Sequence, residues 1–444
     1  MQRNAIARAI SSACLLMSLA HEANAAGFAL HEQGISGLGN AYAGAAAVAE
    51  DATTVWWNPA GMSRLAPGKH FSLGGAYIVP KTEFENRGSV PAALSNLALT
   101  GSGGDAGEAK LEPSFFFAMD LGPKWNLGLG VSVPFGLATK YDADWIGRFQ
   151  GIESEVKTVN INPAVSFKVS DAISVGGGIS YQRGKIDLTT AVNYSAAAFA
   201  VGGAAALGAV GGQGVEGQNR TSIDGHAWGA NLGALFNVLP TTRVGVHYRS
   251  SLNYDLDGTT SFSNRPAALA ASPLVADGDV TLRLKTPDSY ALSAVHELGP
   301  NWQLLADATR TRWSSIDQVP LTRANGTTLD TLVFKFRDTW RLSAGANYRM
   351  GSAWVLKAGI AWDQSPVPDA ETRSVRLPDN DRLWLSFGAA YKMGRSGKLD
   401  LGYSFVKVND ADINNNQAAA GRGIVTGTYK ADIHVFGLQY QHTF

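Results

Sequence analysis

The sequence predicts an all-β protein, a fourteen-stranded antiparallel transmembrane β-barrel with an N-terminal hatch in its lumen. Three observations lead to this prediction. The first 25 residues resemble an export signal, and residues 26–67 are too polar to span a bilayer and too rich in glycine and alanine to form a domain alone. From residue 68 onward, long segments alternate apolar and polar residues. This order is typical of an outer-membrane barrel that carries a plug.

Residues 1–25 have the pattern of a secretory signal peptide. Arg3 and Arg8 precede a short apolar stretch, and Ala23-Asn24-Ala25 supplies a small-x-small cleavage signal, so we expect cleavage after residue 25. The apolar stretch is far shorter than the ~20 residues that a membrane-spanning helix needs. Cleavage also removes Cys14, the single cysteine, which suits a protein that crosses an oxidising periplasm.

The composition argues for one large closed sheet. The 37 Lys+Arg balance the 37 Asp+Glu, so net charge gives no reason to expect nucleic acid or a strongly charged partner. Only 17% of the residues are charged and 50 are glycine. No linker divides the chain after about residue 68. We therefore expect three segments: a signal peptide at 1–25, a hatch at 26–67 and a barrel at 68–444.

Alternating segments indicate the barrel strands. In 399–405 the odd positions are apolar and the even positions small or polar, so one face of the strand is apolar and the other polar. A soluble β-sandwich would also alternate. However, these segments are about ten to twenty residues long, against roughly five to six for soluble strands. Glycine and alanine crowd the polar face, and Trp125, Trp302 and Trp354 stand beside tight turns like an interfacial girdle.

Connections of two lengths indicate the topology. Six links are short, such as Gly299-Pro300-Asn301, whereas 195–222 and 263–277 are long, irregular and apolar. Short turns at one end and long loops at the other are typical of bacterial barrels. With both termini at the short-turn end, six short turns imply seven hairpins and fourteen strands. We expect these strands at 69–81, 112–121, 126–139, 155–169, 173–192, 223–237, 243–260, 279–297, 302–316, 329–349, 354–368, 381–393, 398–409 and 425–444.

The C-terminal strand ends in an aromatic residue. Phe444 is preceded at two-residue steps by His442, Tyr440, Leu438 and Phe436. Such an end resembles the signal that the barrel-insertion machinery reads, so we expect this machinery to be a partner.

Several motifs occur along the chain in a fixed order. They are 26–30 (AGFAL), 36–44 (SGLGNAYAG), Asn58-Pro59-Ala60, 135–139 (FGLAT), 337–341 (RDTWR), 363–368 (DQSPVP) and 377–386 (LPDNDRLWLS). Together they resemble the FadL family of outer-membrane long-chain fatty acid transport proteins, which includes hydrocarbon transporters of the TodX type. The resemblance covers the whole predicted mature chain.

The resemblance implies a monomeric outer-membrane protein of a Gram-negative bacterium that takes up hydrophobic molecules by passive diffusion, without a cofactor. Outer-membrane lipid and lipopolysaccharide would surround it. The implied route leads from an outer hydrophobic groove to an inner pocket that contains Phe28. Movement of the hatch around Asn58, Pro59 and Ala60 would then open a path to a lateral opening at a kink in the third strand.

The matching kink is Pro134-Phe135-Gly136. Because proline lacks a ladder donor and glycine weakens a strand, this sequence should disrupt strand pairing. An ordinary bulge that re-aims the strand is the alternative. The family resemblance places a kink at this point, and the proline and glycine disrupt strand pairing at the same point. This agreement favours a lateral opening.

One departure from the family concerns the ligand head group. Fatty-acid-carrying members use basic residues at the inner pocket, and the positions that match them here are Leu188 and Leu332. Burying an unpaired carboxylate is expensive, whereas an apolar ligand loses nothing against leucine. Neutral aromatic or aliphatic hydrocarbons are thus an alternative to fatty acids. Other basic residues could still meet a carboxylate, chiefly Arg183, Lys185 and Lys335.

Enzyme motifs are missing from the sequence. There is no Gly-x-Ser-x-Gly elbow, and His31-Glu32 and His296-Glu297 lack the second histidine of a zinc helix. We therefore expect a protein that is not an enzyme and holds no metal. A surface protein or adhesin without transport activity is the remaining alternative, and a hatch argues against it.

Overall fold

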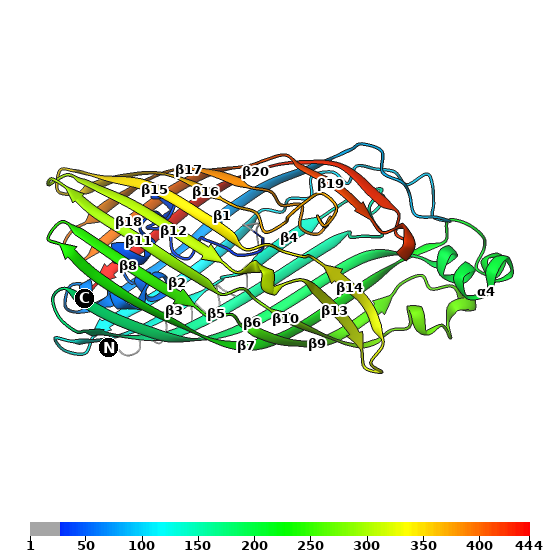
Figure 1. The fold of residues 1–444 in the computed structure, drawn as a ribbon, viewed down its shortest axis with the longest axis horizontal. Helices are drawn as coiled ribbons and strands as arrows, with labels where there is room; N and C mark the ends of the chain where they lie inside the picture. The colour runs from blue at the N-terminus through cyan, green and yellow to red at the C-terminus, as the bar shows by residue number, and fades with distance from the viewer. Residues whose placement is uncertain (1–26) are drawn as a thin grey trace.

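The chain forms a closed antiparallel β-barrel, with the N-terminal segment inside one end (Figure 1). The computed structural model describes residues 27–444, so the expected signal peptide at 1–25 lies outside the described residues. Strand β1 (Lys69–Asn86) pairs with β20 (Ile424–Thr443) over its whole length from His70 and thereby closes the barrel. No helix in residues 27–444 is long and apolar enough to cross a membrane.

Fourteen barrel strands follow one another in chain order, which confirms the predicted number. Eight are continuous apart from local bulges, and six are interrupted and carry two labels each. The continuous strands are β1, β2 (Lys110–Asp120), β5 (Glu153–Lys168), β6 (Ile173–Asn193), β7 (Glu216–Leu239), β16 (Trp354–Asp363), β17 (Arg382–Met393) and β20. The interrupted ones are β3/β4 (Trp125–Ser132, Gly136–Lys140), β8/β9 (Thr242–Arg249, Asn253–Phe262), β10/β11 (Gly278–Lys285, Ser289–Leu298), β12/β13 (Trp302–Thr311, Gln318–Arg323), β14/β15 (Thr328–Val333, Thr339–Met350) and β18/β19 (Gly397–Val408, Ala411–Asn416).

Several expected strand limits differ from the observed ones. Strands β1 and β7 run further towards the long loops than expected, because their ladders continue beyond the alternating core. Strand β16 ends at Asp363 instead of 368, where Pro366 and Pro368 prevent further pairing. The expected strands 243–260, 279–297 and 329–349 each contain an interruption, and 302–316 ends inside one, before β13 begins at Gln318. In both halves of an interrupted strand apolar and polar residues alternate, so this alternation does not reveal where the strand is interrupted.

Aromatic pairs encircle the short-turn end on the outer face. Trp125 lies 4.6 Å from Phe167, Trp302 4.7 Å from Tyr348 and Trp354 4.6 Å from Tyr391, measured between ring centroids. Outward side chains in the middle of the strands are apolar and exposed, with Leu232 and Phe387 as examples. This arrangement matches an apolar band with an aromatic girdle at the membrane interface.

The hatch consists of four short helices inside the short-turn end, drawn in blue in Figure 1. They are η1 (Leu38–Asn40), α2 (Ala45–Val48), α3 (Thr54–Trp57) and η2 (Pro59–Arg64). The hatch touches the wall where the wall has no side chain. A Cβ atom at Gly245 would collide with the Ala46 carbonyl, and one at Gly233 would collide with Asn58. Wall glycines therefore let the hatch backbone pack directly against the strands.

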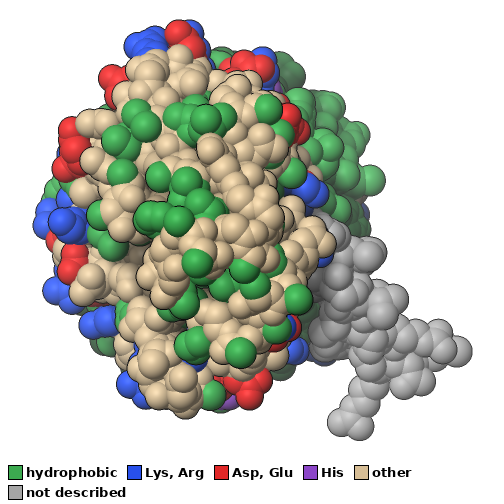
Figure 2. Space-filling view, turned by 90° about the vertical axis from the view of Figure 1, so that its right-hand side faces the viewer, with side chains coloured by type: hydrophobic (Ala, Val, Ile, Leu, Met, Phe, Trp, Pro, Cys, Tyr) green, Lys and Arg blue, Asp and Glu red, His purple; other side chains and the backbone are tan. Residues whose placement is uncertain are grey.

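Long loops and short helices cover the opposite end. Helix α4 (Tyr194–Ala209) projects from it, with η3 (Ala267–Leu269), η4 (Pro273–Val275) and η6 (Ala418–Ala420) as further short helices of the loops. Figure 2 looks onto this end and shows apolar side chains in its middle and charged ones around its rim. A further short helix, η5 (Trp313–Ser315), interrupts the wall between β12 and β13.

Candidate functional site: a plugged lumen with a broken wall

The Asn58-Pro59-Ala60 segment fastens the hatch to the wall. Asn58 is fully buried, and its Nδ2 donates hydrogen bonds to the Ala46 carbonyl at 2.7 Å and to the carbonyls of Ala234 (3.0 Å) and Val246 (3.4 Å). Its Oδ1 accepts from the N–H of Ala60 at 3.1 Å. One side chain therefore joins two parts of the hatch to β7 and β8.

Replacing Asn58 with alanine is expected to loosen the hatch. The substitution leaves buried carbonyl groups without a donor, which costs about 1–3 kcal/mol. Small-solute permeation through the reconstituted protein should rise. Asn162→Ala is the matched control, because Asn162 is buried like Asn58 but donates to the Ile179 carbonyl within the wall (3.0 Å). Equal permeation of the two variants would contradict the role assigned to Asn58.

An ionic cluster holds the hatch at the short-turn end. Lys357 Nζ lies 2.8 Å from Glu50 and 3.3 Å from Asp400, and it donates to the Ser36 carbonyl at 2.7 Å. Lys398 lies 3.1 Å from Glu50. Burial alone would raise the pKa of Glu50, but the two lysines outweigh it and lower the pKa to about 2. The stabilisation from Glu50 is thus present above about pH 4.5 and is lost as the pH falls towards 2.

The predicted kink interrupts the third barrel strand. Strand β3 ends at Ser132 and β4 begins at Gly136. Strand β2 pairs with β3 only from Phe115 onward, and no ladder joins β2 to β4. The wall therefore has a break beside Pro134 and Phe135, as the proline and glycine predict.

The first described residues of the hatch cover this break from inside. The N–H of Leu30 donates to the Pro134 carbonyl (2.9 Å), and the N–H of Gly136 donates to the Phe28 carbonyl (2.8 Å). Ala29 and Phe135 are bridge partners between these two bonds. The N-terminal segment thus occupies the position of a missing strand neighbour at the break.

The structure brings three predicted pocket residues into one apolar cluster, which we call the apolar chamber. Phe28 and Phe135 are buried within it, and Leu188 and Leu332 are half-buried against it. The Phe28 ring lies 5.7 Å from Phe135 and 4.9 Å from Trp313. Its buried members are Phe28, Phe135, Leu137, Ile186, Ile223, Ala227, Leu252, Tyr254, Leu256, Val280, Leu282, Trp313, Ile316, Val319, Leu321, Phe336, Val367 and Leu377.

The three proposed carboxylate partners do not lie in this chamber. Arg183 and Lys185 are on the outer face of β6, where they pair with Asp224 (2.9 Å) and Asp187 (2.8 Å). Lys335 is exposed. Leu188 differs from them because its even position in β6 shares the inward face with the buried Ser180, Gln182 and Ile186.

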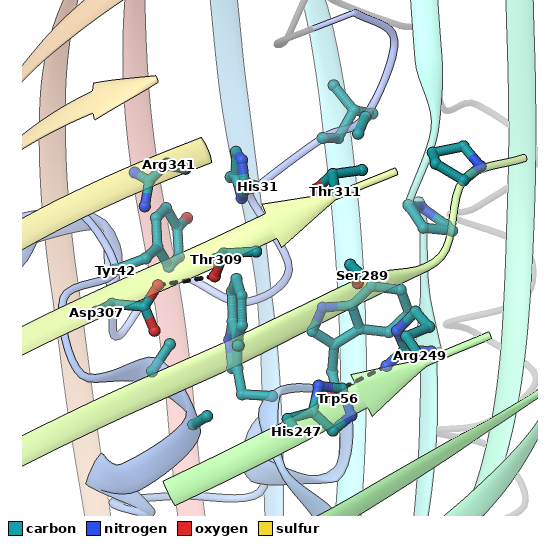
Figure 3. Close-up of a pocket in the computed structure, with 18 of the residues that line it drawn as sticks. His31, Tyr42, Trp56, His247, Arg249, Ser289, Asp307, Thr309, Thr311 and Arg341 are labelled. Atoms are coloured by element: carbon teal, nitrogen blue, oxygen red, sulfur yellow. Dashed lines mark hydrogen bonds between the residues drawn. The ribbon is translucent and has the colours of Figure 1, made fainter. Parts of the chain in front are cut away.

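A cavity, which we call the lumen cavity, lies between the apolar chamber, the hatch and the wall (Figure 3). Its volume is about 110 Å³. Ala29, Leu30, Pro134 and Phe135 line it on the side of the break. The remaining lining residues are His31, Tyr42, Ala45, Ala46, Trp56, Trp57, His247, Arg249, Pro287, Ser289, Ala291, Asp307, Thr309, Thr311 and Arg341.

The lumen cavity holds two arginines that were not among the candidate site residues. Arg249 and Arg341 lie at its opposite ends. Burial, with the charges of Arg341 and Arg382, keeps the pKa of His31 well below its usual value, so this imidazole is neutral. A signal for Arg249 existed in the sequence, because it alternates with the apolar Val244, Val246 and Tyr248.

The loop end carries an apolar depression, which we call the outer groove. It has a volume of about 470 Å³. Its apolar lining combines α4 (Ala196, Ala197, Ala200) with Leu274 and Val275 of η4 and the alanines of η6, and the ion pair of Asp330 with Arg422 also lines it. In residues 27–444, no group of three His, Cys, Asp or Glu residues has the arrangement of a metal site.

The fold and the site define a plugged outer-membrane β-barrel of the transport class. The chain belongs to the outer membrane protein transport protein family (OMPP1/FadL/TodX), whose sequence model matches residues 16–444. Like the family, it is a protein of the Gram-negative outer membrane.

Several relatives and solved structures are similar over most of their length. The long-chain fatty acid transport protein of Escherichia coli (strain K12) is 29% identical over 418 residues, which are 88% of this chain and 90% of the relative. Outer membrane protein P1 of Haemophilus influenzae (strain ATCC 51907) is 27% identical, covering 97% and 98%. A FadL homologue from Pseudomonas aeruginosa shares the fold with a TM-score of 0.85 at 24% identity (94% and 100% covered). The toluene transporter TodX of P. putida has a TM-score of 0.66 at 19% identity (88% and 94% covered).

Proposed function

We propose that this protein takes up long-chain fatty acids or similar hydrophobic molecules by passive diffusion and releases them sideways through the wall. One observation carries the proposal. The apolar chamber contains Phe135, so an apolar surface reaches from the lumen to the point where the β2–β3 ladder stops. A ligand in the chamber can therefore remain in apolar surroundings as far as the wall.

The proposed route has three stations. A ligand first binds in the outer groove, because apolar side chains exposed there favour an apolar ligand. It then enters the apolar chamber and contacts Leu188 and Leu332, and because the side chains of the chamber pack against one another, they must move apart to admit it. Exit requires the segment around Phe28 to leave the break at Pro134-Phe135-Gly136, together with a movement of the hatch around Asn58-Pro59-Ala60. No catalytic step or cofactor takes part.

Two further contacts belong to the proposal. The exposed apolar band would contact membrane lipid and lipopolysaccharide. Phe444, which is 66% exposed, would be read by the insertion machinery. A single copy contains the chamber, the break and the hatch, so a monomer suffices.

Uptake of neutral hydrocarbons is the second candidate function. Leu188 and Leu332 favour it, because both positions carry apolar side chains. A carboxylate bound within the chamber would need a cation there, whereas a neutral hydrocarbon would not. The relatives support both classes, since they include fatty acid transport proteins and a toluene transporter.

Direct binding to the purified protein in detergent tests the proposed function. Oleate and toluene serve as the two ligands, and we expect saturable binding of oleate. Preference for toluene would instead support the second candidate. Binding of neither would contradict uptake of hydrophobic molecules and favour a surface protein without transport.

A further inference from the structure

One guanidinium group in the lumen cavity has no counter-ion. Arg249, the last residue of β8, lies over the ring of Trp56, with 3.4 Å between its Cζ and the ring centroid. Its Nη2 donates to the Trp56 carbonyl (2.9 Å) and its Nη1 to Ser180 Oγ (3.3 Å). These two bonds use two of five N–H donors. In the described chain, 27–444, the ion pairs within 4.0 Å include none to Arg249.

The arginine at the other end of the cavity has acidic neighbours. Arg341 is buried, donates to the Ala41 carbonyl (3.0 Å) and lies beside Tyr42 and Asp307 in Figure 3. It interacts electrostatically with the carboxyl groups of Glu32, Asp307 and Asp363. Arg341 also has no ion pair within 4.0 Å in residues 27–444, but three carboxyl groups interact with its charge, whereas no carboxyl group acts on Arg249.

An uncompensated cation in a confined cavity favours an anionic ligand. Removing a charge from water is costly unless it is paired, so an anion that reaches Arg249 gains more than it would in water. A guanidinium matches the two oxygens of a carboxylate through parallel N–H donors. The surroundings of the cavity are apolar on the side of Leu30, Pro134 and Phe135. A carboxylate attached to a hydrocarbon chain satisfies both requirements.

We propose that Arg249 binds the carboxylate of a long-chain fatty acid at the inner side of the wall break. Arg249 would thereby supply the cation that Leu188 and Leu332 do not provide. The acid head group lies on the Trp56 side of the cavity, and the hydrocarbon chain points past Phe135 into the apolar chamber. This inference rests on the proposed function and selects fatty acids over neutral hydrocarbons as its substrates.

A purely structural role is the competing explanation for Arg249. Its contacts with Trp56 also fix α3 of the hatch to the wall. Arg243 on the same strand provides a matched comparison, because it too points inward and donates to hatch carbonyls, those of Ala47 and Val48. Arg243 does not line the lumen cavity. A structural role should therefore produce the same effect at both positions.

The test compares oleate with oleyl alcohol, which has the same chain and no carboxylate. Binding of both is measured on the purified full-length protein and on R249Q, R249K and R243Q. Loss of a charge-assisted hydrogen bond predicts that R249Q binds oleate about 10- to 100-fold more weakly. Its affinity for oleyl alcohol should stay unchanged. R249K should retain part of the preference for oleate, and R243Q should affect both ligands alike.

Each outcome bears on one proposal. A loss confined to oleate in R249Q supports the carboxylate site. An equal loss for both ligands overturns it in favour of hatch support, and unchanged oleate binding overturns it as well. If the unmodified protein binds neither ligand, the proposed function itself fails. Heat-modifiability on gels identifies a folded barrel, and R249K remains informative if R249Q does not fold.

Discussion

Lys357→Met is expected to release the hatch from the short-turn end of the barrel. The lysine side chain is 2% exposed and neutralises Glu50 and Asp400, of which Asp400 is 3% exposed. Without Lys357, Lys398 alone faces both carboxylates, so one buried charge is left uncompensated, which costs up to about 3–5 kcal/mol. Amide hydrogen exchange of η1 and α2, followed by mass spectrometry, should therefore accelerate by up to about two to three orders of magnitude. Barrel strands should keep their protection.

Two further variants identify the cause of this effect. Lys392→Met removes a lysine from the exposed rim of the same end and should leave hatch exchange unchanged. The double variant Lys357→Met/Asp400→Asn removes the buried pair together, so much of the protection should return. Exchange as fast in the double variant as in Lys357→Met would show that packing of the lysine, not its charge, fixes the hatch.

Much of the architecture is predictable because local patterns determine it. Alternation and turn length predict fourteen strands, since each strand has one face towards lipid and one towards the lumen. The kink is predictable because Pro134 and Gly136 both weaken a ladder and the family resemblance places a kink at the same point. Proline alone is not enough, since Pro80 and Pro163 lie within continuous strands. The prediction that Leu188 lines the pocket comes from the family resemblance. Its even position in β6, on the inward face of the strand, agrees with that prediction.

The parts that sequence reasoning missed depend on contacts between distant segments. Arg183 and Lys185 lie close to Leu188 in the sequence, yet their odd positions place them on the face of Ile179, which is exposed outside the barrel. The side of the strand on which a residue lies, not its closeness in sequence, decides which cation reaches the lumen. The proposed role of Arg249 also depends on its contact with Trp56, which lies almost two hundred residues earlier in the chain. No local sequence pattern predicts such a contact.

A disulfide between the hatch and the wall break is expected to stop uptake. Ala29 and Phe135 are partners in a bridge flanked by the hydrogen bonds Leu30 to Pro134 and Gly136 to Phe28, so they form a non-hydrogen-bonded pair. Cα atoms of such pairs are about 4.5 Å apart, within the range that a disulfide spans. Oxidised Ala29→Cys/Phe135→Cys would hold the N-terminal segment against the break, and lateral exit requires that segment to move. Uptake of labelled oleate by cells without another fatty acid transporter should fall to background.

Reduction separates the cross-link from the substitutions themselves. Cys14 is the only natural cysteine and lies in the predicted signal peptide, so the mature variant would contain no competing thiol. A reductant should restore uptake in the double variant, and each single cysteine variant should be insensitive to oxidation. Oleate binding should persist while the disulfide is closed, because the outer groove stays open to the outside. Normal uptake through the oxidised protein would mean that the ligand leaves by another path, through the hatch towards the periplasm, and the lateral route would be wrong.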